Sequence, residues 1–184
     1  MFIQTEETPN PNTLKFIPGV NVLEEGTVEF KDQDSANISN LAKLIFLING
    51  IDRVFLATEF VSVTKNNDTN WEILKPLILT AIIDHYASGK EIIEKTYNNT
   101  NEYVETDTEV VKQIKELIDQ RVRPAVAMDG GDISFCSFEN GVVTLQMKGA
   151  CAGCPSSTAT LKMGIENMLR HYIPEVREVR AAEM

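Results

Sequence analysis

A polar stretch near the middle of the chain limits its architecture more than any other feature of the sequence. Residues 90–107 include the run Asn98-Asn99-Thr100-Asn101 and have no sustained apolar period, so they lack the side chains that a packed core requires. The patterned segments on either side are each long enough to form a small independent domain. We therefore expect two domains, 1–89 and 108–184, joined by a polar linker over 90–107.

The first segment alternates between strand and helix signals. The apolar spacing of residues 41–48 and the stretch 71–87, which Asn70 can cap, predict two helices. Runs rich in β-branched and aromatic residues predict five strands, at 2–5, 13–17, 27–30, 51–57 and 60–65. These elements indicate a small α+β domain.

The second segment is predicted to have the order helix, strand, strand, helix, strand. The elements are expected at 108–122, 132–138, 142–148, 157–172 and 176–180. Arg123-Pro124 should end the first helix, because proline disfavours helical backbone in the residue before it. Both helices are expected to pack on one face of the sheet, so the whole chain is assigned to the α+β class.

Residues 139–141, Glu-Asn-Gly, are predicted to join the two adjacent strands as a hairpin. A three-residue loop with Gly141 in the left-handed conformation places five apolar side chains on one face of the hairpin, whereas a two-residue loop does not. These side chains are Ile133, Phe135, Val143, Leu145 and Met147. We therefore expect the three-residue loop.

Charge and hydropathy argue against nucleic-acid and membrane partners. The net charge is -10 and the basic residues are scattered, whereas phosphate binding needs a concentrated basic surface. Apolar stretches such as 41–48 and 77–83 are about half the length that spans a bilayer, so we interpret them as core helices. Residues 1–12 fit neither a secretory signal nor a transit peptide. We expect a cytoplasmic protein, or a mitochondrial matrix protein only if a transit peptide has been removed.

The clearest chemical motif is Cys151-Ala152-Gly153-Cys154. Three cysteines in a reducing compartment indicate metal or thiol chemistry, not a disulfide framework. Two cysteines separated by two small residues can bind one metal centre from a single turn. Ser156 or Ser157 is expected to cap the following helix, whose N-terminus favours anionic sulfur. That dipole contributes only about 0.3 to 1 kcal/mol, so a metal must supply most of the deprotonation.

Iron–sulfur clusters usually take four cysteine ligands, one more than the chain contains. In the expected hairpin register Cys136 lies near Thr144 or Leu145, roughly 20 Å from Cys151 and too far to share one cluster. Two chains that each provide Cys151 and Cys154 across a two-fold axis give four ligands most simply. A cluster held between subunits in this way can leave readily, which favours transfer.

Family resemblance supports the cluster hypothesis. Arg123-Pro124-Ala125, the 129–132 sequence Asp-Gly-Gly-Asp and residues 149–157 follow one another in the second segment. Together they resemble the NifU C-terminal domain of Nfu-type iron–sulfur scaffold proteins. Residues 5–19, with Thr8-Pro9-Asn10-Pro11-Asn12, resemble the N-terminal domain of the Nfu subgroup. Both resemblances occur in the family's order.

The resemblance implies that Cys151 and Cys154 bridge a [4Fe-4S] cluster between two subunits, with [2Fe-2S] less expected. It further implies a carrier, not an enzyme, that is a homodimer when the cluster is bound. Its partners would be apo iron–sulfur client proteins and the upstream cluster assembly machinery. The N-terminal domain would tune stability or client contact.

Three alternatives remain open from the residues alone. Structural zinc needs two more ligands, and His171 lies about 25 Å along the helix from the motif, so zinc would need two chains. A thioredoxin-like redox motif should follow a strand of a parallel βαβ unit, whereas the strand before Cys151 pairs in a hairpin. The third alternative is a module that only binds other proteins and has no metal or redox chemistry. The 129–132 segment is expected to be a turn, and Cys136 an ordinary strand residue.

Overall fold

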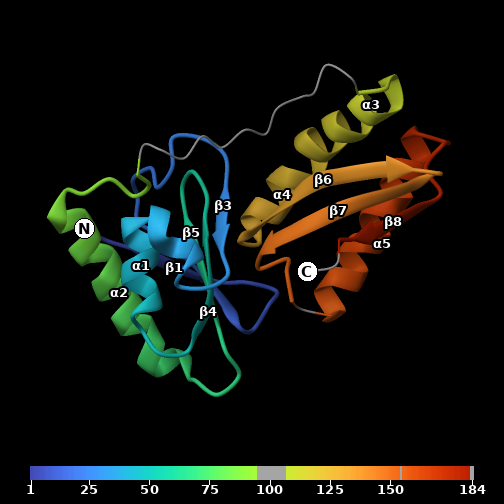
Figure 1. The fold of residues 1–184 in the computed structure, drawn as a ribbon. Coiled ribbons are helices and arrows are strands. Elements are labelled where there is room, and N and C mark those ends of the chain that lie inside the picture. The colour runs from blue at the N-terminus through green and yellow to red at the C-terminus, as the bar shows by residue number, and fades with distance from the viewer. Residues whose placement is uncertain (95–106, 154, 183–184) are drawn as a thin grey trace. The chain divides into compact units, whose positions relative to one another are not determined.

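The computed structural model describes residues 1–94, 107–153 and 155–182, with side chains left out at 155–157. The chain divides into two compact units, Met1–Thr100 and Asn101–Met184 (Figure 1). Most of the expected linker, 95–106, lies outside the described residues. Each unit is therefore described by itself.

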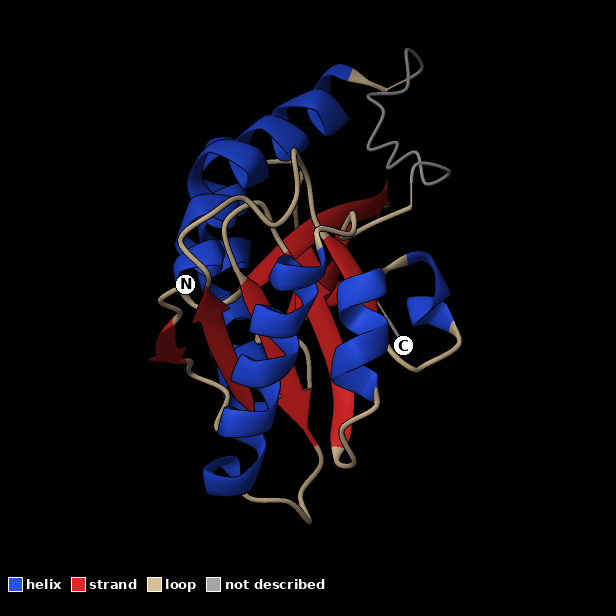
Figure 2. Cartoon of the chain, turned by 90° about the vertical axis from the view of Figure 1, so that its left-hand side faces the viewer, coloured by secondary structure: helices blue, strands red, loops and turns tan. Residues whose placement is uncertain are grey.

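The first unit is an antiparallel five-stranded sheet with helices on one face (Figure 2). The strands run in the order β1-β2-β5-β4-β3. Their bounds are β1 (Gln4–Glu7), β2 (Thr13–Ile17), β3 (Val28–Phe30), β4 (Ile51–Leu56) and β5 (Val61–Lys65). A 3-10 turn, η1 (Ser35–Ile38), precedes α1 (Asn40–Phe46), and α2 (Trp71–Ser88) follows the sheet. All five strands and both helices lie where the sequence predicted them, to within a few residues.

Local chemistry defines both ends of α2. The Asn70 side chain accepts a hydrogen bond from the Glu72 N–H at 3.0 Å, which satisfies one of the free donors of the first turn. Gly89 ends the helix with a φ of 65°, a left-handed conformation that glycine adopts without a steric penalty. The predicted cap and stop are therefore confirmed.

Residues 91–94 form hydrogen bonds with residues 38–40, around the start of α1. The Ile92 carbonyl accepts from the Asn40 N–H at 3.0 Å and from the Ser39 hydroxyl at 2.8 Å. The Glu94 N–H donates to the Ile38 carbonyl at 2.9 Å. The beginning of the stretch that the sequence assigned to the linker thus packs on the first unit.

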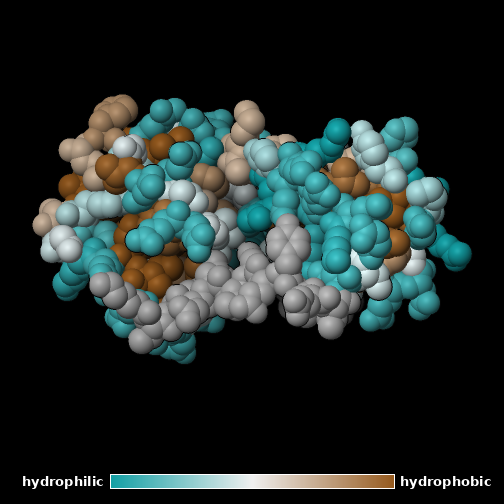
Figure 3. All heavy atoms as spheres, turned by 90° about the horizontal axis from the view of Figure 1, so that it is seen from above, coloured by the Kyte–Doolittle hydropathy of each residue, from teal (hydrophilic) through white to brown (hydrophobic). Residues whose placement is uncertain are grey.

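Helix α2 has aliphatic side chains on both of its faces. Ile78 and Ile82 are fully buried, whereas Ile73, Leu77 and Ile83 are 66%, 48% and 43% exposed. Figure 3 shows hydrophobic residues at the surface of the first unit, at the left of the view. The interpretation of 77–83 as a core segment was therefore only half right. Among the described residues, no helix combines the length and hydrophobicity that crossing a bilayer requires.

The second unit packs its helices on one face of a three-stranded sheet. The strands are β6 (Gly131–Glu139), β7 (Val142–Gly149) and β8 (Glu178–Ala181), in the order β6-β7-β8. The helices are α3 (Glu109–Leu117), a π-helical turn η2 (Ile118–Val122), α4 (Arg123–Met128) and α5 (Pro155–Tyr172). One core cluster contains Ile114, Val126, Ile133, Leu145 and Leu169 from these elements. The α+β class and the one-sided helix packing are as predicted.

Arg123-Pro124 does not end the first helix of this unit, so that prediction was wrong. The backbone stays helical through η2, and Arg123, the residue before Pro124, has helical angles of φ -58° and ψ -43°. Pro124 lies in the first turn of α4, a position that favours proline because its fixed φ already suits a helix. The second helix, α4, begins at Arg123, and Pro124 is its second residue.

The hairpin turn has two residues, not the three that we expected. Glu139 pairs with Val142, and both Asn140 and Gly141 have positive φ, 51° and 81°, as a type I′ turn requires. The register then shifts at a bulge between Phe135 and Ser137. A bulge inserts one unpaired residue into a strand, here Cys136.

The bulge explains why the predicted apolar face is nevertheless correct. Without the bulge, a two-residue turn would place the apolar side chains of β6 and β7 on opposite faces of the hairpin. The extra residue in β6 brings them to the same face. Ile133, Val143, Leu145 and Met147 are buried and Phe135 packs against them. The side chains were assigned to the right face, but for the wrong reason.

Buried His85 should make the stability of the first unit depend on pH. His85 is 1% exposed, and neither ring nitrogen has a hydrogen-bond partner among the described residues. Burial, together with the charge of Lys90, lowers the pKa of His85. The unfolded chain therefore binds a proton below the ordinary pKa of about 6.5 while the folded chain resists it, so stability is lost as pH falls through that value.

Urea unfolding between about pH 7.5 and about pH 5.5, followed by the fluorescence of Trp71, measures this effect. Trp71 is the only tryptophan of the chain, so its signal reports the first unit. H85L should flatten the pH dependence in this range and raise stability at pH 7 by about 1 kcal/mol, because no polar group is left unpaired. H171L, in the second unit, is the control. An equal pH slope in H85L and the parent chain would contradict the prediction.

Candidate functional site

The cysteine motif lies in the turn between β7 and α5. Cys151 is 6% exposed, and its carbonyl accepts a hydrogen bond from the Thr158 hydroxyl at 3.1 Å. The Ala152 N–H donates to the Gly149 carbonyl at 3.1 Å, which closes the turn. Cys154 lies outside the described residues, so its part in the site stays a prediction.

Helix α5 begins earlier than expected. Its first residue is Pro155, and proline is favoured at the first helical position because its missing N–H would have no partner there. Ser156 and Ser157 therefore lie inside the first turn, after the N-cap position. The prediction that the motif immediately precedes a helix is confirmed, and only the cap was assigned wrongly.

The 129–132 segment lies directly against Cys151. Gly130 has a φ of 81° and its carbonyl accepts a hydrogen bond from the Ala150 N–H at 3.1 Å. A Cβ placed on Gly131 would overlap the Cys151 Sγ and come within 2.8 Å of the Lys148 carbonyl. The segment forms the expected turn, and it also forms a wall of the candidate site.

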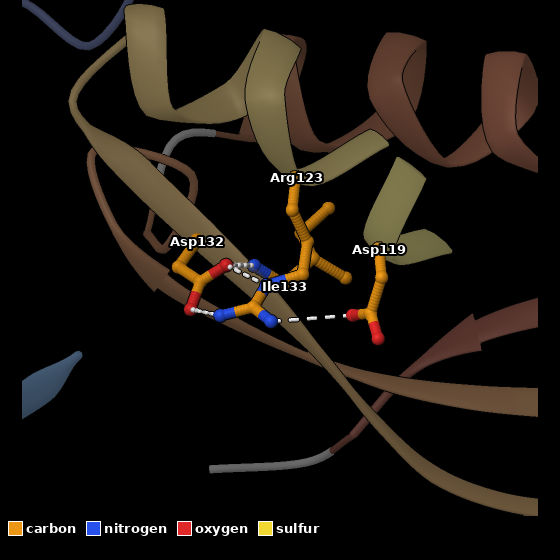
Figure 4. Close-up of polar contacts among 4 residues, drawn as sticks. All are labelled: Asp119, Arg123, Asp132 and Ile133. Atoms are coloured by element: carbon orange, nitrogen blue, oxygen red, sulfur yellow. Dashed lines mark hydrogen bonds and ion pairs between the residues drawn. The ribbon is translucent and has the colours of Figure 1, made fainter. Parts of the chain in front are cut away.

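An ion pair between buried Asp132 and half-buried Arg123 holds the end of this wall in place. Asp132 is 4% exposed and accepts two hydrogen bonds from the Arg123 guanidinium, at 2.9 Å and 3.2 Å. The same guanidinium donates to Asp119 at 3.2 Å from its other side. Figure 4 shows the Arg123 guanidinium between the two carboxylates. The paired geometry at Asp132 is the fork arrangement that makes such bonds strong.

Burial governs the ionisation of Cys151. Burial, with a smaller contribution from the carboxylates of Asp129 and Asp132, raises the pKa of Cys151 to about 12. In the metal-free chain Cys151 is therefore a neutral thiol at physiological pH. The dipole of the helix N-terminus does not make the sulfur anionic, in line with its small expected contribution, so a bound metal must displace the proton.

The remaining candidate ligands lie elsewhere. Cys136 is exposed at the β6 bulge, and His171 is on the last turn of α5, with its ring 5.0 Å from the Tyr172 ring. Within the described ranges, no three potential ligands from His, Cys, Asp and Glu come together. One chain therefore does not gather a closed set of ligands from its described residues.

The topology around the motif removes one argument against a redox function. Strand β8 pairs in parallel with β7, so β7, α5 and β8 form a βαβ unit with the motif at its first turn. We had weighed only the hairpin pairing of β7 against this function, but β7 is the central strand and also pairs in parallel with β8. Burial and the raised pKa of Cys151 still oppose such a function, since reactive cysteines need access and a lowered pKa.

Sequence reasoning missed Arg123, Gly131 and Asp132 as residues of the site. One signal for this site was available in the sequence. Asp132 is a charged residue that directly follows Gly130-Gly131, at the start of a strand that faces a core. Such a carboxylate needs a buried partner, and Arg123 is a basic residue nearby in the sequence.

Replacing Gly131 tests the contact with Cys151. G131A should destabilise the second unit by about 1 to 3 kcal/mol, because the added Cβ meets backbone atoms that cannot move away. Far-UV circular dichroism during thermal unfolding measures the loss, and Trp71 fluorescence separates out the transition of the first unit.

Gly164 provides a matched control for this substitution. It lies inside α5, and an added Cβ meets nothing within 4 Å. G164A should therefore stabilise the second unit by about 0.5 to 1 kcal/mol, the usual gain from replacing a helical glycine. Equal effects of the two substitutions would show that position 131 has room for a side chain.

Both units match known protein families. Residues 114–180 match the family described as NifU-like domain, and residues 3–89 match the family described as scaffold protein Nfu/NifU N terminal. The two matches cover separate parts of the chain, one in each structural unit. Their order is the order that the sequence motifs indicated.

Relatives match along nearly the whole chain. It is 50% identical over 184 residues to NifU-like protein 5, mitochondrial, of Arabidopsis thaliana, covering 97% of this chain and 67% of that protein. It is 49% identical over 181 residues to NFU1 iron-sulfur cluster scaffold homolog, mitochondrial, of Drosophila willistoni, covering 97% and 63%. The chain thus spans about two thirds of these relatives' length. A solved NifU-like protein from Saccharomyces cerevisiae is 28% identical, covering 52% of this chain and 86% of that chain, with a TM-score of 0.47.

Proposed function

Because the chain belongs to the Nfu/NifU scaffold protein family, we propose that it binds an iron–sulfur cluster through Cys151 and Cys154 and delivers it to apo-proteins. The observation that supports this most is the cysteine motif in the turn before α5, inside the part of the chain that matches the NifU-like domain. The name of the Drosophila relative describes an iron–sulfur cluster scaffold.

The cluster that we propose is [4Fe-4S], shared by two chains. Four cysteine ligands are usual for such a cluster, and two motifs related by a two-fold axis supply four. The lack of a third potential ligand beside Cys151 in the described part of the chain supports sharing between chains. The protein is accordingly a homodimer in its loaded state.

Delivery proceeds by ligand exchange. When the cluster binds, each of the two cysteines loses a proton and forms a bond from sulfur to iron. When a client cysteine replaces Cys151, the client thiol loses its proton and Cys151 regains one. No electron changes hands, and the protein is a carrier that turns over no substrate. The burial that keeps free Cys151 protonated favours the return step.

The partners follow from this exchange. They are apo iron–sulfur proteins that offer free cysteines, and the assembly machinery that supplies the cluster. Both relatives described above are mitochondrial by name, which supports the mitochondrial alternative for the compartment. A cytoplasmic location stays a prediction.

A thiol–disulfide function is the second candidate, because the motif lies at the first turn of a βαβ unit. It requires that the pair reduces a protein disulfide, with two electrons and two protons leaving Cys151 and Cys154 as they form their own disulfide. An insulin reduction assay distinguishes the candidates. Activity that disappears in both C151S and C154S would favour the redox function.

Single cysteine replacements test the proposed site. Anaerobic reconstitution with iron and sulfide should give a brown dimer with about four iron atoms per two chains if each motif supplies two ligands. C151S and C154S should each lose most of the bound iron, because each removes two of the four ligands from the dimer. Iron and sulfide analysis, with light scattering for the mass, measures both outcomes.

C136S is the matched control, since Cys136 is an exposed residue at the β6 bulge. It should load and dimerise like the parent chain. Transfer is then followed as activation of an apo-enzyme that requires [4Fe-4S]. A monomer that holds zinc tightly and rejects iron would refute the proposal.

A further inference from the structure

We propose that Arg123 is a positioning residue for Cys151, acting through Asp132 and the Gly130-Gly131 turn. This inference rests on the proposed function only where it concerns the cluster. The geometry is a chain of contacts from the start of α4 to the buried sulfur, and each contact is a separate step.

The first step fixes Asp132. Its carboxylate is buried at the start of β6, and a buried carboxylate is costly unless it is paired and hydrogen-bonded. Arg123 supplies two bonds, at 2.9 Å and 3.2 Å, and the Ile133 N–H supplies a third, at 2.8 Å. The position of Asp132 therefore depends on the guanidinium.

The second step passes from Asp132 to the sulfur. Gly131 precedes Asp132 and lies so close to Cys151 that a Cβ would overlap its Sγ. The Gly130 carbonyl is tied to the Ala150 N–H at 3.1 Å. Movement of Asp132 would thus displace both glycines, and with them the surface against which the sulfur rests.

The geometry at position 123 requires an arginine. Only a planar fork can bond both Asp132 oxygens while a third N–H reaches Asp119. The Asp119 side chain is 39% exposed, against 5% for Asp132, and exposed ion pairs contribute little. The Asp132 pair therefore does the positioning, and the Asp119 pair serves as an internal comparison.

Arg123 itself is held by the fold. It is the first residue of α4, directly after the π-helical turn and before Pro124, and Val122 and Val126 beside it in the chain are buried in the core. The guanidinium thus projects from a backbone that is fixed on both sides. This gives the contact chain a rigid starting point.

Amide hydrogen exchange on the full-length, metal-free chain tests the positioning without any cluster. In R123Q the Ala150 amide should exchange about tenfold faster, while the core amides of Ile165 and Leu169 stay within about twofold of the parent. R123K keeps the charge without the fork and should lie between the two. D132N keeps the shape and provides the same test if R123Q does not fold. D119N is the matched control and should leave Ala150 unchanged.

Cluster retention tests the consequence for the site. After anaerobic reconstitution, R123Q and D132N should lose the cluster to an iron chelator about tenfold faster than the parent chain, the scale expected when support for a metal ligand is removed. D119N should behave like the parent. R123K should recover part of the loss, which a change in overall stability alone would not explain.

The outcomes separate this inference from the proposed function. If the parent chain loads a cluster and R123Q and D132N retain it equally well, with unchanged exchange at Ala150, the positioning role is wrong and the carrier function stands. If the parent chain takes up no cluster, the proposed function fails, and exchange at Ala150 still decides the positioning. Uniformly faster exchange across the second unit would reduce Arg123 to a stability role and overturn the inference.

Discussion

The close approach of Gly131 to Cys151 is the contact on which the cysteine end of the second unit depends. A side chain at position 131 would take the space of the sulfur and press on the backbone near Lys148. Because glycine leaves this space open, the turn before β6 and the turn after β7 can lie against each other. The Ala150 to Gly130 hydrogen bond joins them. The surroundings of Cys151 are therefore set by a segment far from it in the sequence.

The same contact bears on how firmly a metal would be held. Burial and two nearby carboxylates keep the free Cys151 sulfur protonated, so binding must displace a proton and release can restore it. A cysteine that regains its proton on release suits a transiently bound cluster better than a permanently bound one. It also opposes a redox dithiol, although the βαβ surroundings of the motif would permit one.

Much of the fold was predictable because the spacing of apolar residues along the chain reflects which side chains are buried. The strands, the two long helices and the Asn70 cap came from patterns that extend over a few residues. The errors came where two local rules competed. Pro124 can end a helix or begin one, and only the packing of Val122 and Val126 decides which. At the hairpin, a bulge at Cys136 achieved the side-chain arrangement that we had assigned to a longer loop.

Local sequence patterns were enough to predict the order of the elements, the α+β class, the family resemblance and the candidate ligands Cys151 and Cys154. Spacing is enough for these, since a cysteine pair two residues apart defines its own geometry within one turn. Only the tertiary structure showed that Gly131 backs the sulfur, that Arg123 reaches Asp132, and that β8 lies beside β7. Contacts between distant residues depend on how the strands and helices pack, and the local spacing of apolar residues does not specify that packing.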